Sequence, residues 1–330
     1  MPRILPLTLI ESVEPNDPCT HLKSTTLKKL RDLDLEAPIT AGRPPYLSAA
    51  SGLVIVKSTA YVVADDEQHL GVFSLTKKAP GMLLRLFAGD LPNKKKPRKK
   101  HKADLEALLL LPPFRSCRHG ALFALGSGST QKRRRGVLLP LNAKGLVTDT
   151  PRLIDLAPWF EPIEDVIGEL NIEGAVIANG RLNLLQRGNK GADVNAIVKL
   201  PLDRVLDALA NDEMNELPFT ARRYQLGSID DTPLGFTDGS ALADGRIVFT
   251  AVAEDSKSAY DDGSCAGSAI GILAANGRLQ SMRRLTPDAK VEGIDARIVD
   301  QSMRLHLVSD ADDVDVPASL YVAEVGRASK

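Results

Sequence analysis

This chain of 330 residues has few aromatic residues, three cysteines and no net charge. Aromatic side chains make up 4% of the sequence, and 25 Gly and 21 Pro favour many turns. The three cysteines are odd in number and far apart, so we expect no disulfide framework and a cytoplasmic location. Basic and acidic residues balance at 42 each, which gives no argument for nucleic-acid binding.

Long apolar runs are also missing. The N-terminal MPRILPLTLIESVEP is broken by Pro6 and Thr8 and closed by Glu11, so it is too short and too polar for a secretory signal. No other run approaches the length of a membrane span. We therefore expect no membrane association.

The chain instead contains one pattern five times. A typical copy is Asn171-Ile172-Glu173-Gly174-Ala175, which begins a strand, followed by an Asn179-Gly180 turn and a second strand that ends at Arg187-Gly188-Asn189. Two more strands complete each of the first four copies, and the five copies begin near residues 48, 103, 170, 236 and 290. Four short strands repeated at this spacing are typical of a β-propeller.

We therefore predict an all-β, single-domain protein, a five-bladed β-propeller that covers residues 1–330. The fifth copy is one strand short, and residues 3–12 supply the missing outer strand in this prediction. The alternative is a six-bladed propeller whose sixth blade uses residues 15–46, although this segment lacks the hydrophobic runs that strands need. A separate pattern of apolar residues predicts a short amphipathic helix over residues 202–217.

Polar residues recur at two equivalent places in the five copies. The first strands align Ser51, Glu106, Glu173, Ser240 and Glu292. The ends of the second strands carry Asp65, Ser127, Arg187, Glu254 and Asp310. Since the first strand of a blade lines the channel and begins where the second strand ends, both rings are predicted to converge on one mouth of the propeller.

The three glutamates of the inner ring predict a metal site. Like charges at close range raise one another's pKa or require a cation. Calcium accepts a loose shell of carboxylate, hydroxyl and carbonyl oxygens, so we expect Ser51, Glu106, Glu173, Ser240 and Glu292 to hold calcium. The alternative is that these side chains hydrogen-bond the backbone of neighbouring blades.

Two basic runs, at residues 94–102 and 132–135, are predicted to flank the same mouth. One interpretation is that they attract a small anionic ligand such as a phosphate ester. The other is that they form solvated loops, as charge runs usually do. Aromatic residues are not interleaved with either run, so nucleic acid is not an expected partner.

Several of these phrases resemble an uncharacterised bacterial propeller family related to phytase-like propellers with esterase-like activity. The resemblance rests on Ser48-Ala49-Ala50-Ser51-Gly52, Ala64-Asp65-Asp66, Asp104-Leu105-Glu106-Ala107, Gly126-Ser127-Gly128-Ser129 and the Asn171–Ala175 stretch. The order Ser, Glu, Glu, Ser, Glu in the inner ring is similar to that of the calcium-activated nucleotidases (apyrases), five-bladed propellers with a central calcium. This second resemblance implies the same five residues as calcium ligands.

Two functions follow from these patterns. The first is a calcium-dependent hydrolase of a phosphate ester or another small anionic ester, with Asp65 or Glu254 as general base. Its substrate would contact Asp66, Ser127, Ser129, Arg187, Asn189 and Asp310. The second is a propeller that binds a ligand or a protein without turnover and in which the calcium is structural.

Overall fold

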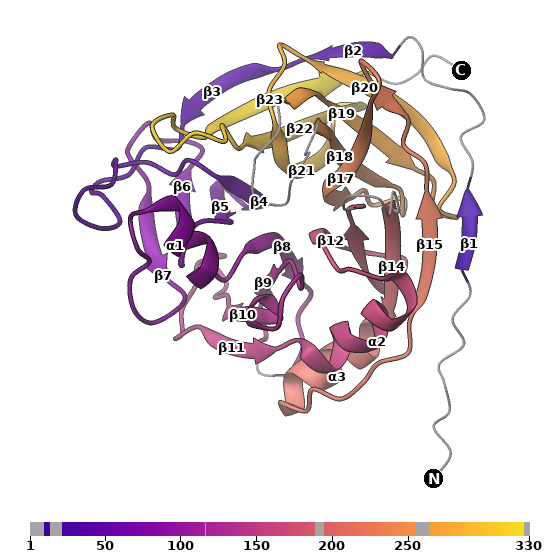
Figure 1. The fold of residues 1–330 in the computed structure, drawn as a ribbon, viewed down its shortest axis with the longest axis horizontal. Helices are drawn as coiled ribbons and strands as arrows, with labels where there is room; N and C mark the ends of the chain where they lie inside the picture. Colours follow the sequence, from indigo (N-terminus) through magenta and orange to yellow (C-terminus); the bar gives the residue numbers. More distant parts are fainter. Residues whose placement is uncertain (1–9, 14–21, 116, 189–194, 255–264, 327–330) are drawn as a thin grey trace.

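The computed structural model describes residues 10–13, 22–115, 117–188, 195–254 and 265–326. Its strands form five sheets arranged in a ring around a central axis (Figure 1). The predicted five-bladed β-propeller is therefore confirmed. Residues 22–46 do not form a sixth blade, because their strands join the outer edges of blades 4 and 5.

Blades 1 and 2 are four-stranded antiparallel sheets. Blade 1 contains β4 (Ala50–Val56), β5 (Thr59–Ala64), β6 (His69–Ser74) and β7 (Met82–Arg85). Blade 2 contains β8 (Leu105–Leu111), β9 (Ala121–Gly126), β10 (Arg135–Pro140) and β11 (Arg152–Asp155).

Blades 3 to 5 have the same core of strands and take additional strands from the N-terminal region. Blade 3 contains β12 (Ile172–Ala178), β13 (Arg181–Gln186), β14 (Asn195–Pro201), β15 (Thr220–Tyr224) and β1 (Ile10–Val13). Blade 4 contains β16 (Ser228–Ile229), β17 (Thr232–Ala241), β18 (Ile247–Glu254), β19 (Cys265–Leu273), β20 (Leu279–Thr286) and β2 (Lys23–Thr26). Blade 5 contains β21 (Val291–Val299), β22 (Ser302–Ser309), β23 (Ser319–Val325) and β3 (Lys28–Asp32).

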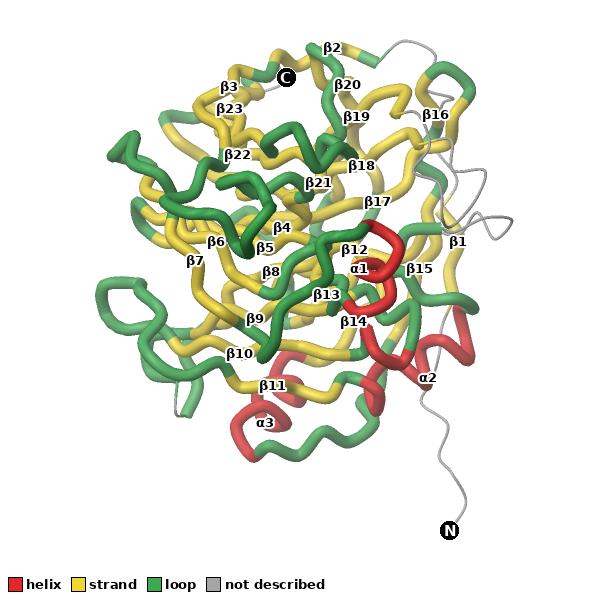
Figure 2. Tube along the Cα trace, turned by 60° about the vertical axis from the view of Figure 1, so that its left-hand side comes forward, coloured by secondary structure: helices red, strands yellow, loops and turns green. Residues whose placement is uncertain are grey.

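Hydrophobic packing between adjacent blades holds the ring together. Each of the five blade interfaces has its own cluster of buried apolar side chains, contributed by facing strands of two blades. The largest cluster, between blades 2 and 3, also takes Trp159 and Phe160 from a helix. The strands therefore fill the body of the molecule, and the helices lie at its surface (Figure 2).

The inner strands β4, β8, β12, β17 and β21 contact one another in order and close the ring. They approach closely because a glycine follows the bulged residue in four of the five strands. A Cβ on Gly174 would lie 2.6 Å from the Cα of Asp238, and one on Gly52 would lie 2.8 Å from the amide nitrogen of Leu108. At these positions the absence of a side chain, rather than backbone freedom, is what the fold requires.

The strand that closes the ring differs from the prediction. It comes from the N-terminal region, but it is β3, which pairs antiparallel with β23. Within the predicted segment 3–12, the described residues 10–12 belong to β1, which pairs in parallel with β15 of blade 3. The prediction followed apolar content, but an outer strand needs only backbone hydrogen bonds. Every side chain of β3 is exposed or half-buried, and the apolar anchors Leu27 and Leu33 lie just outside it.

The basic run at residues 94–102 does not form the solvated loop that one of the two interpretations expected. It forms α1 (Lys95–His101), whose Arg98 is buried. Two further helices are α2 (Ala157–Ile167), before β12, and α3 (Leu202–Asn211), before β15. The predicted helix at residues 202–217 is therefore present and ends after 10 residues. In the second basic run a 3₁₀ turn, η1, covers Gln131–Arg133.

Truncation tests the assignment of the closing strand. Removal of residues 1–33 takes away β1, β2 and β3 and exposes the edge of β23, so we expect a large fall in melting temperature or loss of folding. Removal of residues 1–26 takes away β1 and β2, and blades 3 and 4 keep at least four strands each, so we expect a small fall. Thermal unfolding followed by circular dichroism measures both. Equal destabilisation by the two truncations would contradict closure by β3.

Gly174→Ala tests the close approach of the inner strands. The new methyl group meets the backbone of Asp238, so we expect a loss of about 1–3 kcal/mol in the free energy of unfolding. The matched control is Gly239→Ala, where the nearest atoms to a Cβ are side-chain atoms, of Leu185 at 3.2 Å and of Val176 at 3.5 Å. Urea denaturation should show a clearly smaller loss for the control, and equal losses would count against the argument.

Candidate cation site at the propeller mouth

The ends of the second strands meet at one face, as the sequence predicts. Asp65, Ser127, Arg187 and Asp310 directly follow β5, β9, β13 and β22, and Glu254 is the last residue of β18. The connections from fourth to first strands, which include α1 and α2, lie on this same face. We call this face the mouth.

A β-bulge in each inner strand brings the inner ring to the mouth. The strand register shifts between Ile172 and Gly174, so Glu173 is the extra residue, and Ser51, Glu106 and Glu292 occupy the same position in their strands. A bulge re-aims a side chain relative to the regular pleat. Glu173 and Glu292 are 8% and 5% exposed, so both carboxylates are taken largely out of water.

Ser240 is not the member of this ring in blade 4. The bulge in β17 lies between Phe236 and Gly239, so the residue before the glycine is Asp238, and Ser240 follows two positions later. The sequence alignment was wrong here because this bulge contains two residues instead of one. Ser240 accepts a hydrogen bond from the amide of Ala296 at 2.9 Å, and Ser51 donates one to the carbonyl of Leu105 at 2.6 Å. Both serines therefore bond the backbone of neighbouring blades.

Asp238 lies at the base of the ring and is fully buried. Its carboxylate accepts hydrogen bonds from the amide of Gly239 at 2.7 Å and from that of Ile294 in blade 5 at 3.0 Å. Burial raises the pKa of Asp238 well above its ordinary value, and the backbone donors, which include Leu53 of blade 1, oppose this shift. This residue therefore links the inner strands of three blades.

One half of the mouth is built around Lys102. Its ammonium group pairs with Asp65 and, at 2.8 Å, with Asp104. Asp104 also accepts from the Ser127 hydroxyl at 2.5 Å and pairs with Arg133 at 2.9 Å. In the described part of the chain, Asp65, Asp104 and Glu106 are the acidic, histidine or cysteine residues with metal-binding geometry, since an oxygen of each lies within 4.8 Å of the others.

The other half contains Arg187 and Lys290. Arg187 pairs with Glu254 at 2.7 Å and more distantly with Glu173 at 3.6 Å. Lys290 lies 2.6–3.8 Å from an oxygen of each of its four acidic neighbours, which are Glu254, Glu292, Asp310 and Asp312. Both cations are largely buried, and the neighbouring carboxylates of the protein neutralise their charge.

Acidic groups outnumber basic groups in this network. Its described members include the cations Lys102, Arg133, Arg187 and Lys290, and the carboxylates Asp65, Asp104, Glu106, Glu173, Glu254, Glu292, Asp310 and Asp312. Eight carboxylates therefore share four positive side chains. Glu106 has no ion pair or hydrogen bond to its carboxylate among the described residues.

Burial in this network shifts the carboxyl groups toward protonation. Burial raises the pKa of Glu106 well above its ordinary value, and Asp104 and Glu173 add to the shift. Burial raises the pKa of Glu173 to about 7 although Arg187 opposes it. The pKa of Asp310 is also raised well above its ordinary value by burial, against the effect of Lys290. A mouth with this deficit of positive charge favours a proton or a bound cation.

Three further residues were predicted to contact the substrate, and the two that are described lie in different environments. Asp66 pairs with Arg43 at 3.0 Å and with Arg98 at 3.7 Å, so it fixes α1 to blade 1. Ser129 lies 2.9 Å from Ser127 and accepts from Arg133, so it faces the network. Asn189 lies outside the described residues.

Sequence reasoning missed four important groups, Lys102, Asp104, Asp238 and Lys290. Lys102 is one of many basic residues in the run at 94–102, and Lys290 lies in a loop without a recognisable motif, so neither stands out in the sequence. Asp104 precedes β8 with a positive φ of 57°, a conformation that the sequence does not reveal. The Asp-Gly pair at residues 238–239 did carry a signal, since it matches Glu-Gly at 173–174 and 292–293.

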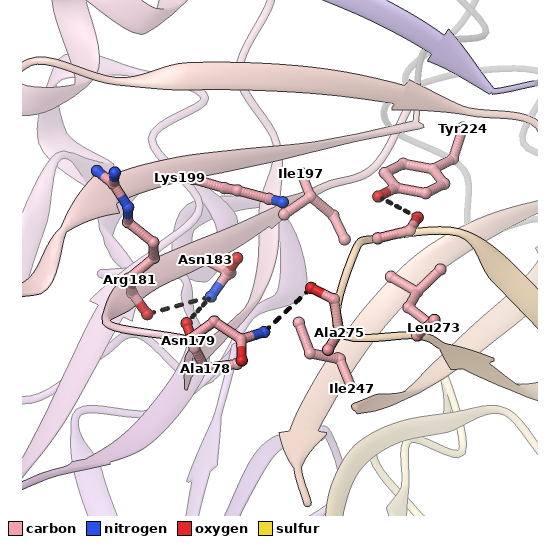
Figure 3. A pocket seen from close by; sticks show the side chains of 12 residues that line it. Ala178, Asn179, Arg181, Asn183, Ile197, Lys199, Tyr224, Ile247, Leu273 and Ala275 are labelled. Atoms are coloured by element: carbon pink, nitrogen blue, oxygen red, sulfur yellow. Dashed lines mark hydrogen bonds between the residues drawn. The ribbon is translucent and has the colours of Figure 1, made fainter. Parts of the chain in front are cut away.

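A cavity lies on the opposite face, between blades 3 and 4 (Figure 3). It is bordered by the Asn179 turn, Tyr224 and Ala275, and the Tyr224 hydroxyl donates to the carbonyl of Gly277 at 3.0 Å. Its volume of about 40 Å³ has room for little more than water. The cavity is therefore no alternative to the mouth.

The fold and the mouth together define a five-bladed β-propeller with a carboxylate-rich opening. The chain belongs to a family of unknown function (DUF6929), which its sequence matches over residues 46–325. A comparison with curated proteins finds no match. No helix in the described ranges is long and apolar enough to cross a membrane.

Solved structures of similar shape are distant in sequence. A luciferin-regenerating enzyme is 10% identical, with 92% of this chain and 98% of that chain covered and a TM-score of 0.46. A glutaminyl cyclase from Myxococcus xanthus is 12% identical, with coverage of 92% and 98% and a TM-score of 0.46. The β-propeller domain of Myceliophteria thermophila Cps50 is 11% identical, with coverage of 93% and 84% and a TM-score of 0.38. The fold assignment rests on the strand pairing of the chain itself.

The raised pKa of Glu173 predicts an unusual pH dependence. The folded state holds a proton that the unfolded state releases between the ordinary pKa of 4.5 and about 7. In this window the folded state binds more protons, so the free energy of unfolding falls as the pH rises. We expect the melting temperature in chelator to fall from about pH 5.5 to about pH 7.5, and Glu173→Gln to reduce this fall. An unchanged slope in the variant would contradict the assignment.

Proposed function

We propose that the mouth binds a divalent cation, calcium by the chemistry of its ligands, and that the protein hydrolyses a small anionic ester there. The observation that carries the proposal is the charge balance, with eight carboxylates and four cations in the two halves of the mouth. Hard oxygen ligands from carboxylates suit calcium. The resemblance to calcium-activated nucleotidases implied the same ion, but it keeps only four of its five residues, because Asp238 takes the place of Ser240 in the ring.

Glu106 is the best-placed ligand, because its carboxylate has no ion pair or hydrogen bond among the described residues. An oxygen of Asp104 lies within 4.8 Å of it, but Asp104 also bonds Lys102, Arg133 and Ser127. Glu173 and Glu292 add charge from the adjoining blades, and Glu173 raises the pKa of Glu106. The two serines of the predicted set fit this site less well because their hydroxyls bond backbone groups.

When bound, calcium would polarise the ester and orient it in the mouth. Of the two predicted bases, the geometry supports Asp65 over Glu254. Asp65 lies in the same group of oxygens as Glu106 and Asp104, and burial raises its pKa although Lys102 opposes the shift. Glu254 lies outside this group of oxygens and pairs with Arg187 at 2.7 Å. Arg187 and Ser127 remain the proposed contacts for the anionic part of the substrate.

The second candidate function is a binding propeller with a structural calcium. The ion pairs favour it, since Lys102 pairs with Asp65 and Arg187 with Glu254, so both candidate bases are occupied. Catalysis would require that one of these pairs opens when substrate binds. A non-catalytic ligand site requires no such opening.

Calcium binding itself is tested by melting. At a hundredfold excess over its dissociation constant, calcium should stabilise the protein by about 2.7 kcal/mol. Because calcium competes with protons for the same carboxylates, the rise in melting temperature should be larger at about pH 7.5 than at about pH 5.5. Glu106→Gln should abolish the rise, whereas the exposed control Glu324→Gln should keep it. An equal rise in both variants would place the ion elsewhere.

Turnover separates the two functions. Phosphomonoesters, phosphodiesters, nucleotides and carboxylesters are each assayed with calcium and with chelator. For the hydrolase we expect calcium-dependent turnover that falls by about 10²-fold or more in Asp65→Asn, the removal of a general base. Calcium-dependent melting without turnover on any substrate would favour the binding propeller. Absence of both responses would refute the cation site.

A further inference from the structure

The basic side chains around the mouth are divided into two groups. Lys102, Arg133 and Arg98 point inward and pair with buried carboxylates. A second group points outward and is exposed, and it consists of Lys94, Lys96, Lys100, His101 and Lys132. We call this second group the basic ridge. In the described structure none of its four lysines has an ion pair, although acidic groups are in excess nearby.

The ridge is a single surface held on a fixed support. Arg98 anchors α1 through Glu67 at 2.9 Å, and Glu67 is itself held by Arg43 at 2.5 Å. Arg133 donates to the carbonyl of Lys99 at 3.2 Å, which brings η1 and its Lys132 against α1. In Figure 1, α1 lies over blade 1. Lys96 and Lys100 are therefore presented by an ordered helix, with Lys94 at its N-cap and Lys132 on the adjacent η1 turn.

We infer that the basic ridge is a docking surface for an acidic segment of a partner protein. Charge complementarity supplies the attraction, because four unpaired lysines face solvent with no acidic residue within α1. The helix has 7 residues and is about 10 Å long, which matches about three residues of an extended acidic segment. An ordered helix also limits the entropy lost on binding.

Other occupants match the surroundings less well. Exposed side chains on a helix do not enclose a small ligand, which needs a concave site. A flat anionic membrane would also meet the acidic residues of the same face, such as the exposed Glu161, Glu169, Asp313 and Asp315. Single-stranded nucleic acid uses aromatic stacking, and the ridge has no aromatic residue.

The test measures binding of a fluorescein-labelled peptide of eight glutamates to the full chain by fluorescence anisotropy. We expect binding that weakens steeply with salt. The double variant Lys96→Glu/Lys100→Glu should bind about tenfold more weakly or worse. The matched control is Lys77→Glu/Lys78→Glu, two exposed lysines in the β6–β7 connection on the opposite face, and it should bind as the unchanged protein does. The replaced side chains are exposed, so both variants should keep their melting temperature.

Each outcome decides the inference. Equal weakening in both double variants would mean non-specific attraction and would overturn it. Binding of phosphatidylserine vesicles or of an oligo(dT) strand in preference to the peptide would assign another occupant and would also overturn it. Peptide binding should persist in Glu106→Gln and in the presence of chelator, because the ridge is separate from the cation site.

Discussion

The close approach of the five inner strands is the constraint on which the rest of the structure depends. A bulge in each strand turns one side chain toward the mouth, and in four of the five strands a glycine follows the bulge, which at Gly52 and Gly174 lets the next blade approach. The same local geometry therefore closes the ring and concentrates acidic side chains at its opening. Charge at the mouth is a direct result of how the propeller is closed.

Two largely buried lysines neutralise part of this negative charge. Lys102 and Lys290 both come from connections that enter first strands, and each lies among carboxylates of two neighbouring blades. Their pKa values are raised by those carboxylates although burial acts in the opposite direction, so both remain cationic. They neutralise the carboxylates with which they pair, whereas Glu106 forms no ion pair with a described side chain.

Periodicity predicted much of this molecule because the repeat is itself the fold. The five blades and the residues that end the second strands follow from apolar strands and matched polar ends. Ser240 was misplaced because a bulge adds a residue without any signal in hydrophobicity. The closing strand β3 was missed because an outer strand with exposed Lys28 and Lys29 resembles a polar loop. The pairing of Lys102 with Asp65 joins two separate connections, and a single sequence carries no record of it.

The position of β3 has a consequence for how the chain folds. Ser319 bonds to Asp32 across a sequence separation of 287 residues, so a strand near residue 30 completes the blade that residues 291–325 form. Blade 5 therefore cannot be completed before β23 has been synthesised. Contacts between residues so far apart in sequence form slowly, because closing a long loop costs entropy before the contacts stabilise it. We therefore expect the pairing of β3 with β23 to be a late step of folding.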